Sequence, residues 1–168
     1  MLRIVVMGVS GSGKSSVAQE VADTLGGTYL EADDLHPAEN LAHMAAGKPL
    51  DDAMRAPWLE RICQEMDACA DPIVVTACSA LKRDYRSLMR RTLTGLKIVY
   101  LDGSKSLIAI RMAARQDHFM PLSLLDSQFA TLEVPTKDED ALHVSIAPPL
   151  SEVVAEICDA LSRTAASA

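Results

Sequence analysis

A glycine-rich segment near the N-terminus constrains the fold of this chain more than any other feature. Residues 8–15 read Gly-Val-Ser-Gly-Ser-Gly-Lys-Ser, which is the pattern G-x-x-x-x-G-K-[ST]. The apolar run 2–7 before it is typical of a buried parallel strand, and Val17, Val21 and Leu25 after it recur at helical spacing. A strand, a tight glycine loop and a helix in this order predict a phosphate-binding loop in an α/β sheet.

The residues of this loop have complementary tasks. Its glycines let backbone N–H groups point inward at a phosphate, and the helix N-terminus adds a partial positive charge. We expect Lys14 to reach the β- and γ-phosphates of ATP, and the Ser15 hydroxyl to ligate Mg²⁺. The alternative, a glycine turn without a ligand, is disfavoured by the strand and helix on either side. The predicted nucleotide-binding residues are Gly8, Ser10, Gly11, Ser12, Gly13, Lys14, Ser15 and Ser16.

Length and charge exclude several classes of protein. The chain has 168 residues and a formal net charge of −7, which suits one domain and disfavours a nucleic-acid-binding surface. No apolar run approaches the roughly 20 residues of a membrane span, and the first predicted strand follows no signal-peptide pattern. The four cysteines lack metal-binding spacing, so we expect reduced thiols. A cytoplasmic protein without membrane or nucleic-acid partners is expected.

Strands and helices alternate along the rest of the chain. Apolar runs predict further strands at 28–30, 73–77 and 97–101, and alternating apolar residues predict one at 141–146, with helical patterns between them. Such alternation predicts a five-stranded parallel sheet with helices on both faces. Within the helical segments, we expect Pro57 to restart a helix and Ser79 to cap the helix after the third strand.

Two stretches are longer than a simple crossover requires. The stretch 34–70 is predicted to be a helical insertion that binds the substrate. The stretch 111–135, which contains Pro121, is predicted to be a lid. No linker divides the chain, so residues 1–168 are expected to form a single domain.

The third predicted strand lacks the acidic residue that often helps to hold Mg²⁺ in phosphate-loop proteins, since it ends in Thr-Ala-Cys at 76–78. Asp33, after the second strand, is the best replacement, because ligands bind at the carboxyl ends of parallel strands. We expect Asp33 to accept a proton from an attacking hydroxyl or to orient Mg²⁺. Glu31 and Asp34 remain alternatives for this role, as does a solvated Asp33 with no role.

Arg111 and Arg115 are four residues apart on one predicted helix, just before the predicted lid. Two guanidinium groups on one face can clamp a triphosphate and stabilise the phosphoryl group during transfer. An ordinary solvated helix face is the alternative, but the phosphate loop favours nucleotide binding. Lys14, Asp33 and Arg115 are therefore the predicted catalytic residues.

Basic residues also gather in the middle of the chain. Lys82, Arg83 and Arg86 follow the third strand, and Arg55 follows a pair of aspartates. In an acidic protein these cations indicate an anionic second substrate, although Lys and Arg also cover helix surfaces routinely. His36 is either a hydrogen-bond donor to this substrate or a capping or surface histidine. The predicted substrate-binding residues are Asp33, His36, Arg55, Lys82 and Arg86.

The motifs together resemble those of the gluconate kinases, the small P-loop gluconokinases. Besides the loop, the resemblance rests on Asp33-Asp34-Leu35-His36-Pro37, Arg55-Ala56-Pro57-Trp58-Leu59, Cys78-Ser79-Ala80-Leu81-Lys82, His118-Phe119-Met120 and Ser127-Gln128-Phe129. It implies a nucleoside-monophosphate-kinase-like fold with a closing lid, and a homodimer.

The resemblance also implies the reaction, which is the ATP-dependent phosphorylation of D-gluconate at its 6-hydroxyl to give 6-phospho-D-gluconate and ADP. It implies that Arg111 lies near adenine, Arg115 near the phosphates and Asp33 near the reacting hydroxyl. Arg55, Lys82 and Arg86 become candidates for contacts with the carboxylate and hydroxyls of gluconate.

Two other functions stay open at this point. One is a different small P-loop kinase, acting on shikimate or a nucleoside monophosphate. The other is a nucleotide-binding regulator that senses a sugar acid without phosphorylating it. The presence of Lys14, Ser15, Asp33 and Arg115 argues against the regulator, because a protein that no longer catalyses transfer does not need them.

Overall fold

The computed structural model describes residues 1–114 and 122–166, whose strands form one five-stranded parallel sheet in the order β2-β3-β1-β4-β5. The central strand β1 pairs with β3 on one side and with β4 on the other. The strands are β1 (Leu2–Met7), β2 (Thr28–Leu30), β3 (Ile73–Ala77), β4 (Leu96–Asp102) and β5 (Leu142–Ser145). The predicted sheet is confirmed.

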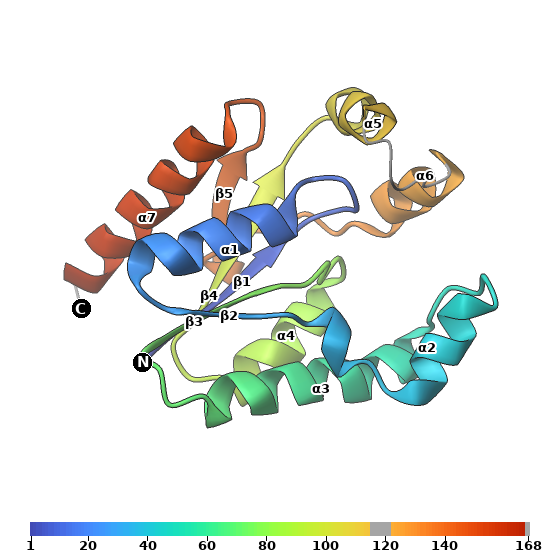
Figure 1. Cartoon of the computed structure of the whole chain (residues 1–168), viewed down its shortest axis with the longest axis horizontal. Coiled ribbons are helices and arrows are strands. Elements are labelled where there is room, and N and C mark those ends of the chain that lie inside the picture. The colour runs from blue at the N-terminus through green and yellow to red at the C-terminus, as the bar shows by residue number, and fades with distance from the viewer. Residues whose placement is uncertain (115–121, 167–168) are drawn as a thin grey trace.

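Helices connect the strands and cover both faces of the sheet (Figure 1). They are α1 (Lys14–Leu25), α2 (Ala38–Ala45), α3 (Asp52–Ala68), α4 (Arg83–Thr92), α5 (Lys105–Ala113), α6 (Leu122–Thr131) and α7 (Leu150–Ala166), with short 3-10 turns η1 (Asp33–Leu35) and η2 (Lys137–Glu139). Helices α1 and α7 lie on one face, and α3 and α4 lie on the other. Helices α2, α5 and α6 lie toward one end of the molecule, on the right in this view.

The central strand sends alternate side chains into two separate hydrophobic cores. Ile4 and Val6 pack in the core that includes residues of α1 and α7, while Val5 and Met7 pack in the core that includes residues of α3 and α4. All four side chains are fully buried. This explains the continuous apolar run, because both faces of the strand are covered. The loop after Met7 therefore starts from the best-anchored strand of the sheet.

The expectation that Pro57 restarts a helix is wrong. Helix α3 continues through Pro57 without a break, and it begins earlier, at an N-cap formed by Asp51. The Asp51 Oδ1 atom accepts a hydrogen bond from the backbone N–H of Met54 at 2.8 Å. Proline removes one intrahelical hydrogen bond, and the cap together with the burial of the adjacent Trp58 offsets that loss.

The expectation that Ser79 caps the following helix is also wrong. Helix α4 begins at Arg83, after Lys82 in an extended conformation. Ala80 lies between the end of β3 and Lys82 and has a positive φ of 42°. A right-handed helix cannot include a residue in this conformation. The segment after β3 therefore forms an irregular loop before it enters the helix.

The predicted insertion 34–70 forms η1, α2 and α3. The predicted lid 111–135 includes the end of α5 and all of α6, together with residues 115–121, which lie outside the described ranges. Closure of this segment remains a prediction. No helix within 1–114 and 122–166 combines the length and apolar character that crossing a bilayer requires.

Candidate active site

Two glycines of the phosphate loop take conformations that disfavour any other residue. Gly11 has a φ of 81°, and a side chain there would also collide with α5, because a Cβ atom would lie 2.8 Å from Met112 Sδ and 3.0 Å from Ile108 Cγ2. Gly13 has a φ of 89° and is the N-cap of α1. The first turn of α1 therefore directs its unpaired N–H groups into the loop, as an anion site requires.

The polar side chains of the loop surround the same space. Lys14 folds back over the loop, and its Nζ atom donates to the carbonyl of Val9 at 3.0 Å. Ser15 and Ser16 follow in the first turn of α1. The Ser12 hydroxyl is buried without a hydrogen-bond partner among the described residues. A phosphate-bearing ligand suits this arrangement, since it offers an acceptor to donors that the protein leaves unused.

A cavity of about 350 Å³ opens beside the loop. Arg111 forms part of its wall, where its Nη2 atom donates to the carbonyl of Ile146 at 2.6 Å. The wall is otherwise mainly aliphatic, and it includes Gly11, Ser12, Gly13, Ser16, Val17, Ala114, Pro148, Pro149, Leu150 and Val153. A flat apolar slot with one guanidinium group, beside a phosphate loop, has the character of a nucleotide-base site. Arg115, the other predicted arginine, lies outside the described residues.

Asp33 lies in η1, just past the carboxyl end of β2, with a side chain that is 83% exposed. Its neighbour Glu31 is already engaged, since it accepts a hydrogen bond from the Tyr29 hydroxyl at 2.8 Å and one from the backbone N–H of Asp33 at 3.3 Å. The structure therefore gives Glu31 a supporting position and leaves the Asp33 carboxylate accessible, which favours Asp33 as the reactive acid.

Tyr29 connects this acidic turn to the phosphate loop. Burial, reinforced by the hydrogen bond to Glu31, raises the pKa of Tyr29 to about 12. The Ser15 hydroxyl interacts with the same phenol, and the charge of Asp33 also acts on it. Ser15 and Asp33 thus both act on Tyr29, and their joint role at Mg²⁺ remains a prediction.

Ser15 and Asp33 are the predicted Mg²⁺ ligands, and both offer the hard oxygen atoms that Mg²⁺ prefers. No group of three or more His, Cys, Asp and Glu side chains in 1–114 and 122–166 could hold a metal ion by itself. Mg²⁺ sites often use one or two protein oxygens and complete their shell with phosphates and water. The pair therefore fits a metal that arrives with a nucleotide.

His36 is not a surface histidine, because its side chain is only 7% exposed, although the residue is the C-cap of η1 through its backbone N–H. The ring stacks on Trp58 at a centroid distance of 4.1 Å, and its Nε2 atom lies 4.0 Å from Asp33 Oδ1. Burial lowers the pKa of His36, and the charge of Arg55 lowers it further, while Asp33 opposes both. A neutral imidazole is therefore held beside the carboxylate of Asp33, the candidate proton acceptor.

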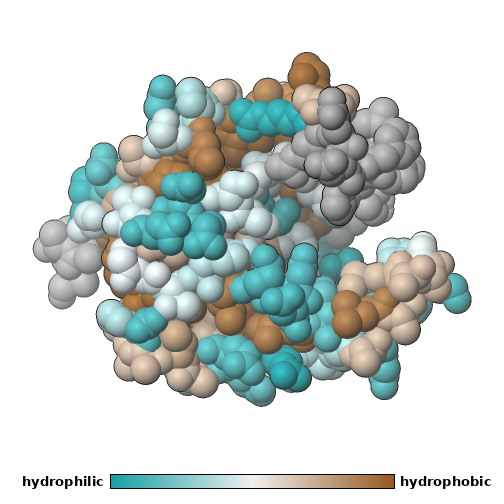
Figure 2. Space-filling model, viewed as in Figure 1, coloured by the Kyte–Doolittle hydropathy of each residue, from teal (hydrophilic) through white to brown (hydrophobic). Residues whose placement is uncertain are grey.

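A second cavity, of about 620 Å³, lies between the N-terminal parts of α3 and α4 and helix α6. Figure 2 shows the surface hollowed where α6 faces α2 and α3 (right in the view). The wall of this acceptor cavity comprises Pro49, Leu50, Asp51, Asp52, Ala53, Arg55, Leu81, Lys82, Tyr85, Ser127, Gln128 and Thr131.

Two of the predicted cations, Lys82 and Arg55, line the acceptor cavity. The Nζ atom of Lys82 lies 2.7 Å from Asp52 Oδ2, and the Tyr85 hydroxyl donates to the same carboxylate. The hydrogen bond between Lys82 and Asp52 raises the pKa of the lysine and lowers that of the aspartate. Arg55 is steadied by a bond from its Nε atom to the Leu50 carbonyl at 3.2 Å. Two cations, a carboxylate and a phenol suit an anion that carries hydroxyl groups.

The structure contradicts the prediction that Arg86 binds substrate. Arg86 is fully buried, and its Nε and Nη2 atoms donate to the two carboxylate oxygens of Glu139 at 2.6 and 2.8 Å. Its Nη1 atom donates to the carbonyls of Ala80 and Leu81 at 3.0 and 3.1 Å. The guanidinium group is therefore occupied in joining α4 to η2 and to the loop after β3.

The sequence reasoning missed one residue that the structure brings into the site. Gln128, on α6, hydrogen-bonds to Ser10 of the phosphate loop and also lines the acceptor cavity. The signal available in the sequence is the Ser-Gln-Phe motif at 127–129, whose residue types do not by themselves indicate a task. The His118-Phe119-Met120 motif lies outside the described residues.

Comparisons with known proteins find similarity along almost the whole chain. A family model described as an AAA domain matches residues 4–135. The thermoresistant gluconokinase of Escherichia coli K12 is 43% identical over 162 residues, which cover 95% of this chain and 93% of that protein. The crystal structure of a gluconokinase from Sinorhizobium meliloti 1021 is 47% identical, with a TM-score of 0.90 over 99% of this chain and 94% of the other.

A more distant similarity concerns the fold alone. A shikimate kinase from Aquifex aeolicus superposes with a TM-score of 0.65 over 99% of this chain and all of its own, at 18% identity. Identity at this level shows a shared architecture without a shared substrate. It confirms the predicted P-loop kinase fold and gives no support to the shikimate alternative.

Proposed function

The chain belongs to the gluconokinase family of small P-loop kinases, and we propose on this premise that it transfers the γ-phosphoryl group of ATP to the 6-hydroxyl of D-gluconate. The products are 6-phospho-D-gluconate and ADP. The observation that carries the proposal is the 43% identity to a gluconokinase over 95% of the chain. The acceptor cavity supports it, because Arg55 and Lys82 supply cations for a carboxylate at a distance from the reacting hydroxyl.

On the donor side, the protein's task is to hold the triphosphate and to balance its charge. Phosphoryl transfer requires little covalent help from a protein, so positioning and electrostatics account for most of the catalysis. The loop amides and Lys14 bind the phosphates, and Arg111 lies against the base. Ser15 and Asp33 would hold Mg²⁺, which would neutralise charge on the phosphate oxygens.

On the acceptor side, Asp33 prepares the nucleophile. Its exposed carboxylate accepts the proton of the 6-hydroxyl as that oxygen forms its bond to phosphorus. The neutral imidazole of His36, whose Nε2 atom lies 4.0 Å from Asp33 Oδ1, has a single N–H group, which donates to a hydroxyl of the acceptor. Arg55 and Lys82 bind the carboxylate of gluconate, which fixes the end of the gluconate molecule that lies opposite its 6-hydroxyl.

The remaining features of the proposal concern residues and assemblies beyond the site. Arg115 contributes charge to the transferring group, and the segment 111–135 closes over the substrates to exclude water. The protein acts as a homodimer of single-domain chains in the cytoplasm. Size-exclusion chromatography with light scattering measures the oligomeric state directly.

An acceptor panel with coupled detection of ADP tests the function. D-gluconate, shikimate, nucleoside monophosphates and related sugar acids are each supplied with ATP and Mg²⁺. We expect strong stimulation by D-gluconate and a loss of turnover when the metal is chelated. Stimulation by another acceptor but not by gluconate would refute the proposal, and gluconate binding without any turnover would favour the regulator instead.

A further inference from the structure

Helix α6 reaches the phosphate loop through one side chain. The Oε1 atom of Gln128 accepts a hydrogen bond from the backbone N–H of Ser10 at 2.5 Å, while its Nε2 atom donates to Ser10 Oγ at 3.0 Å. These contacts use an acceptor and a donor of one planar carboxamide, and together they set its orientation. Asparagine carries the same group but is one methylene shorter, so it cannot reach Ser10 from the same helix position.

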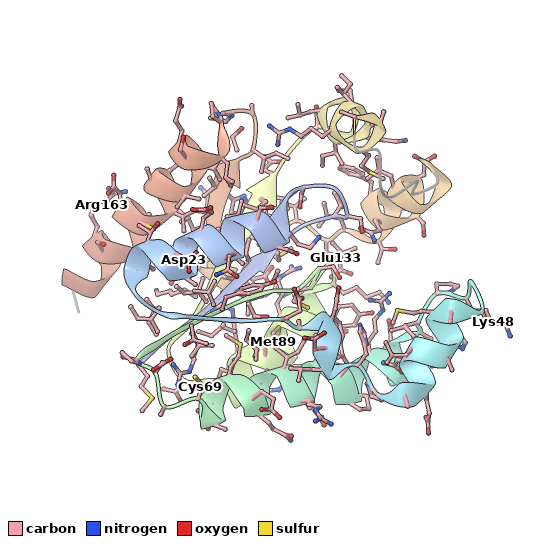
Figure 3. The ribbon with its side chains drawn as sticks, viewed as in Figure 1. Asp23, Lys48, Cys69, Met89, Glu133 and Arg163 are labelled. Atoms are coloured by element: carbon pink, nitrogen blue, oxygen red, sulfur yellow. The ribbon has the colours of Figure 1, made fainter. Side chains whose placement is uncertain are left out.

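Helix α6 is itself anchored to the body of the molecule. Leu125 is fully buried in the core formed with α1 and α7, and Phe129 packs against that core. After the helix, the backbone N–H of Glu133 donates to the Leu81 carbonyl at 2.9 Å, and its carboxylate accepts from the backbone N–H of Arg83 at 2.6 Å. Figure 3 labels Glu133 in the middle of the molecule. The position of α6 is thus tied to the beginning of α4.

Gln128 also forms part of the acceptor cavity, together with Ser127 and Thr131 of the same helix. Lys82, at the N-cap of α4, lines the same cavity. One carboxamide therefore contacts the phosphate loop and stands in the wall of the space beside it. Its partner Ser10 immediately precedes Gly11, where the left-handed turn of the loop begins. By fixing Ser10, Gln128 therefore also fixes the start of the loop segment whose backbone amides are proposed to bind phosphate.

We propose that Gln128 is a positioning residue that aligns the phosphate loop with the acceptor cavity during phosphoryl transfer. This inference rests on the proposed kinase function. Transfer needs the reacting atoms about 3–3.5 Å apart, and a displacement of about 1 Å can cost on the order of 100-fold in rate. Gln128 limits such displacement by joining one wall of the acceptor cavity to the loop that carries the donor.

Steady-state kinetics of Gln128→Ala test this role. We expect kcat to fall roughly 10- to 100-fold, while the KM values for ATP and gluconate stay within about three-fold, because alignment acts in the transition state. The melting temperature stays within a few degrees of the wild type, since the lost bonds lie at a partly exposed site. A purely structural role would instead lower the melting temperature and leave kcat per folded molecule unchanged.

A double-mutant cycle sharpens the test. Ser10→Ala removes the hydroxyl partner and leaves the backbone N–H, so its effect on kcat should be smaller than that of Gln128→Ala. Ser10→Ala breaks one of the two hydrogen bonds that Gln128→Ala removes. The double variant should therefore be no slower than Gln128→Ala alone. Gln128→Glu keeps the reach but replaces a donor with a negative charge beside the phosphates, and Gln128→Asn shortens the reach. Both should remain at least ten-fold slower than the wild type.

Asp126→Asn, on the same helix as Gln128, is the matched control, since it breaks an exposed ion pair with Lys105 of α5. Its kinetics should equal those of the wild type. Wild-type kcat in Gln128→Ala, or a loss of kcat that simply follows the unfolded fraction, would overturn the proposal. If Gln128→Ala does not fold, the Asn and Glu variants carry the same comparison.

The two proposals fail separately. If the wild type does not phosphorylate gluconate, the proposed function fails, and the Gln128 variants are assayed with whichever acceptor the panel identifies. If the wild type phosphorylates gluconate and the Gln128 variants match it, the positioning role alone is refuted.

Discussion

The donor and acceptor sides of this site are built in different ways. The phosphate loop comes from the contiguous residues 8–16, and its main contacts are backbone groups between the central strand and α1. The acceptor cavity draws its side chains from α3, α4 and α6, which are distant in the chain. The first site depends on glycine geometry, whereas the second depends on how three helices pack. Substitutions on the two sides should therefore change different quantities.

The largest effect is expected on the donor side. Lys14→Ala removes the charge that we propose for binding the β- and γ-phosphates, so kcat should fall by at least about 10³-fold. The loss should be the same for every acceptor that the wild type accepts, because the donor is common to all of them. A coupled ADP assay measures it, and substantial turnover by this variant would show that the loop lysine is not needed for transfer.

Asp33→Asn tests the proposed catalytic carboxylate. The amide keeps the shape of the carboxylate but cannot accept a proton, so kcat should fall on the order of 10²- to 10³-fold. Nucleotide affinity, measured by calorimetry with ADP, should change little. Glu31→Gln is the matched comparison, and its loss should be smaller because Glu31 supports the turn. If Glu31→Gln lowers kcat more than Asp33→Asn does, the carboxylate that accepts the proton is that of Glu31.

Arg86→Met should affect stability instead of the reaction. It leaves Glu139 buried without its partner, which should lower the free energy of unfolding by about 3 kcal/mol. Urea denaturation measures the loss, and the KM for gluconate of the folded fraction should stay at the wild-type value. Arg83→Met, three residues earlier on α4, breaks the exposed pair with Asp138 and should destabilise far less. A selective rise in KM for gluconate would restore Arg86 to the acceptor site.

Lys82→Met should affect substrate affinity. The ammonium group lines the acceptor cavity, so its loss should raise the KM for gluconate roughly ten-fold or more, with little change in the KM for ATP. Lys97→Met removes a lysine from another exposed pair, with Asp140, and serves as the control. Equal rises in both KM values would mean that Lys82 shapes the whole cleft and does not bind the acceptor.

The smallest expected effect is a dependence of stability on pH. The hydrogen bonds from Arg86 hold the pKa of Glu139 below its ordinary value near 4.5. This stabilisation is complete above the ordinary pKa and is lost as the pH falls through the lower value of the folded state. Between about pH 7 and pH 4, the free energy of unfolding should decrease less in Arg86→Met than in the wild type. Parallel urea curves at the two pH values give the comparison.

The sequence was a good guide to the sheet because the relevant signals are local. Apolar runs marked the first four strands, alternation of apolar residues marked the fifth, and the loop motif located the donor site. Local sequence signals did not predict where two helices begin, because tertiary packing determines those positions. Asp51 starts α3 early enough for Pro57 to lie within it, and the left-handed conformation of Ala80 moves the start of α4 past Ser79.

The acceptor site shows the limit of residue type as a guide. Lys82 and Arg86 are four residues apart in one basic segment, and the sequence offered no reason to separate them. The structure places Lys82 on the acceptor cavity and buries Arg86 against Glu139, which lies far along the chain. The contact of Gln128 with Ser10 is likewise a product of tertiary packing, since a glutamine on a helix has no preferred partner at such a distance in sequence.

The two separate cores on the faces of the sheet have a consequence for how such a kinase diversifies. Residues of α3 and α4 pack only with the Val5 side of the central strand, while α1 and α7 pack with the Ile4 side. Substitutions on opposite faces share few partners, so their effects on stability should be nearly additive. A lineage can therefore remodel the walls of the acceptor cavity that α3 and α4 supply by successive small steps, while the half that supports the nucleotide, α6 included, is inherited unchanged.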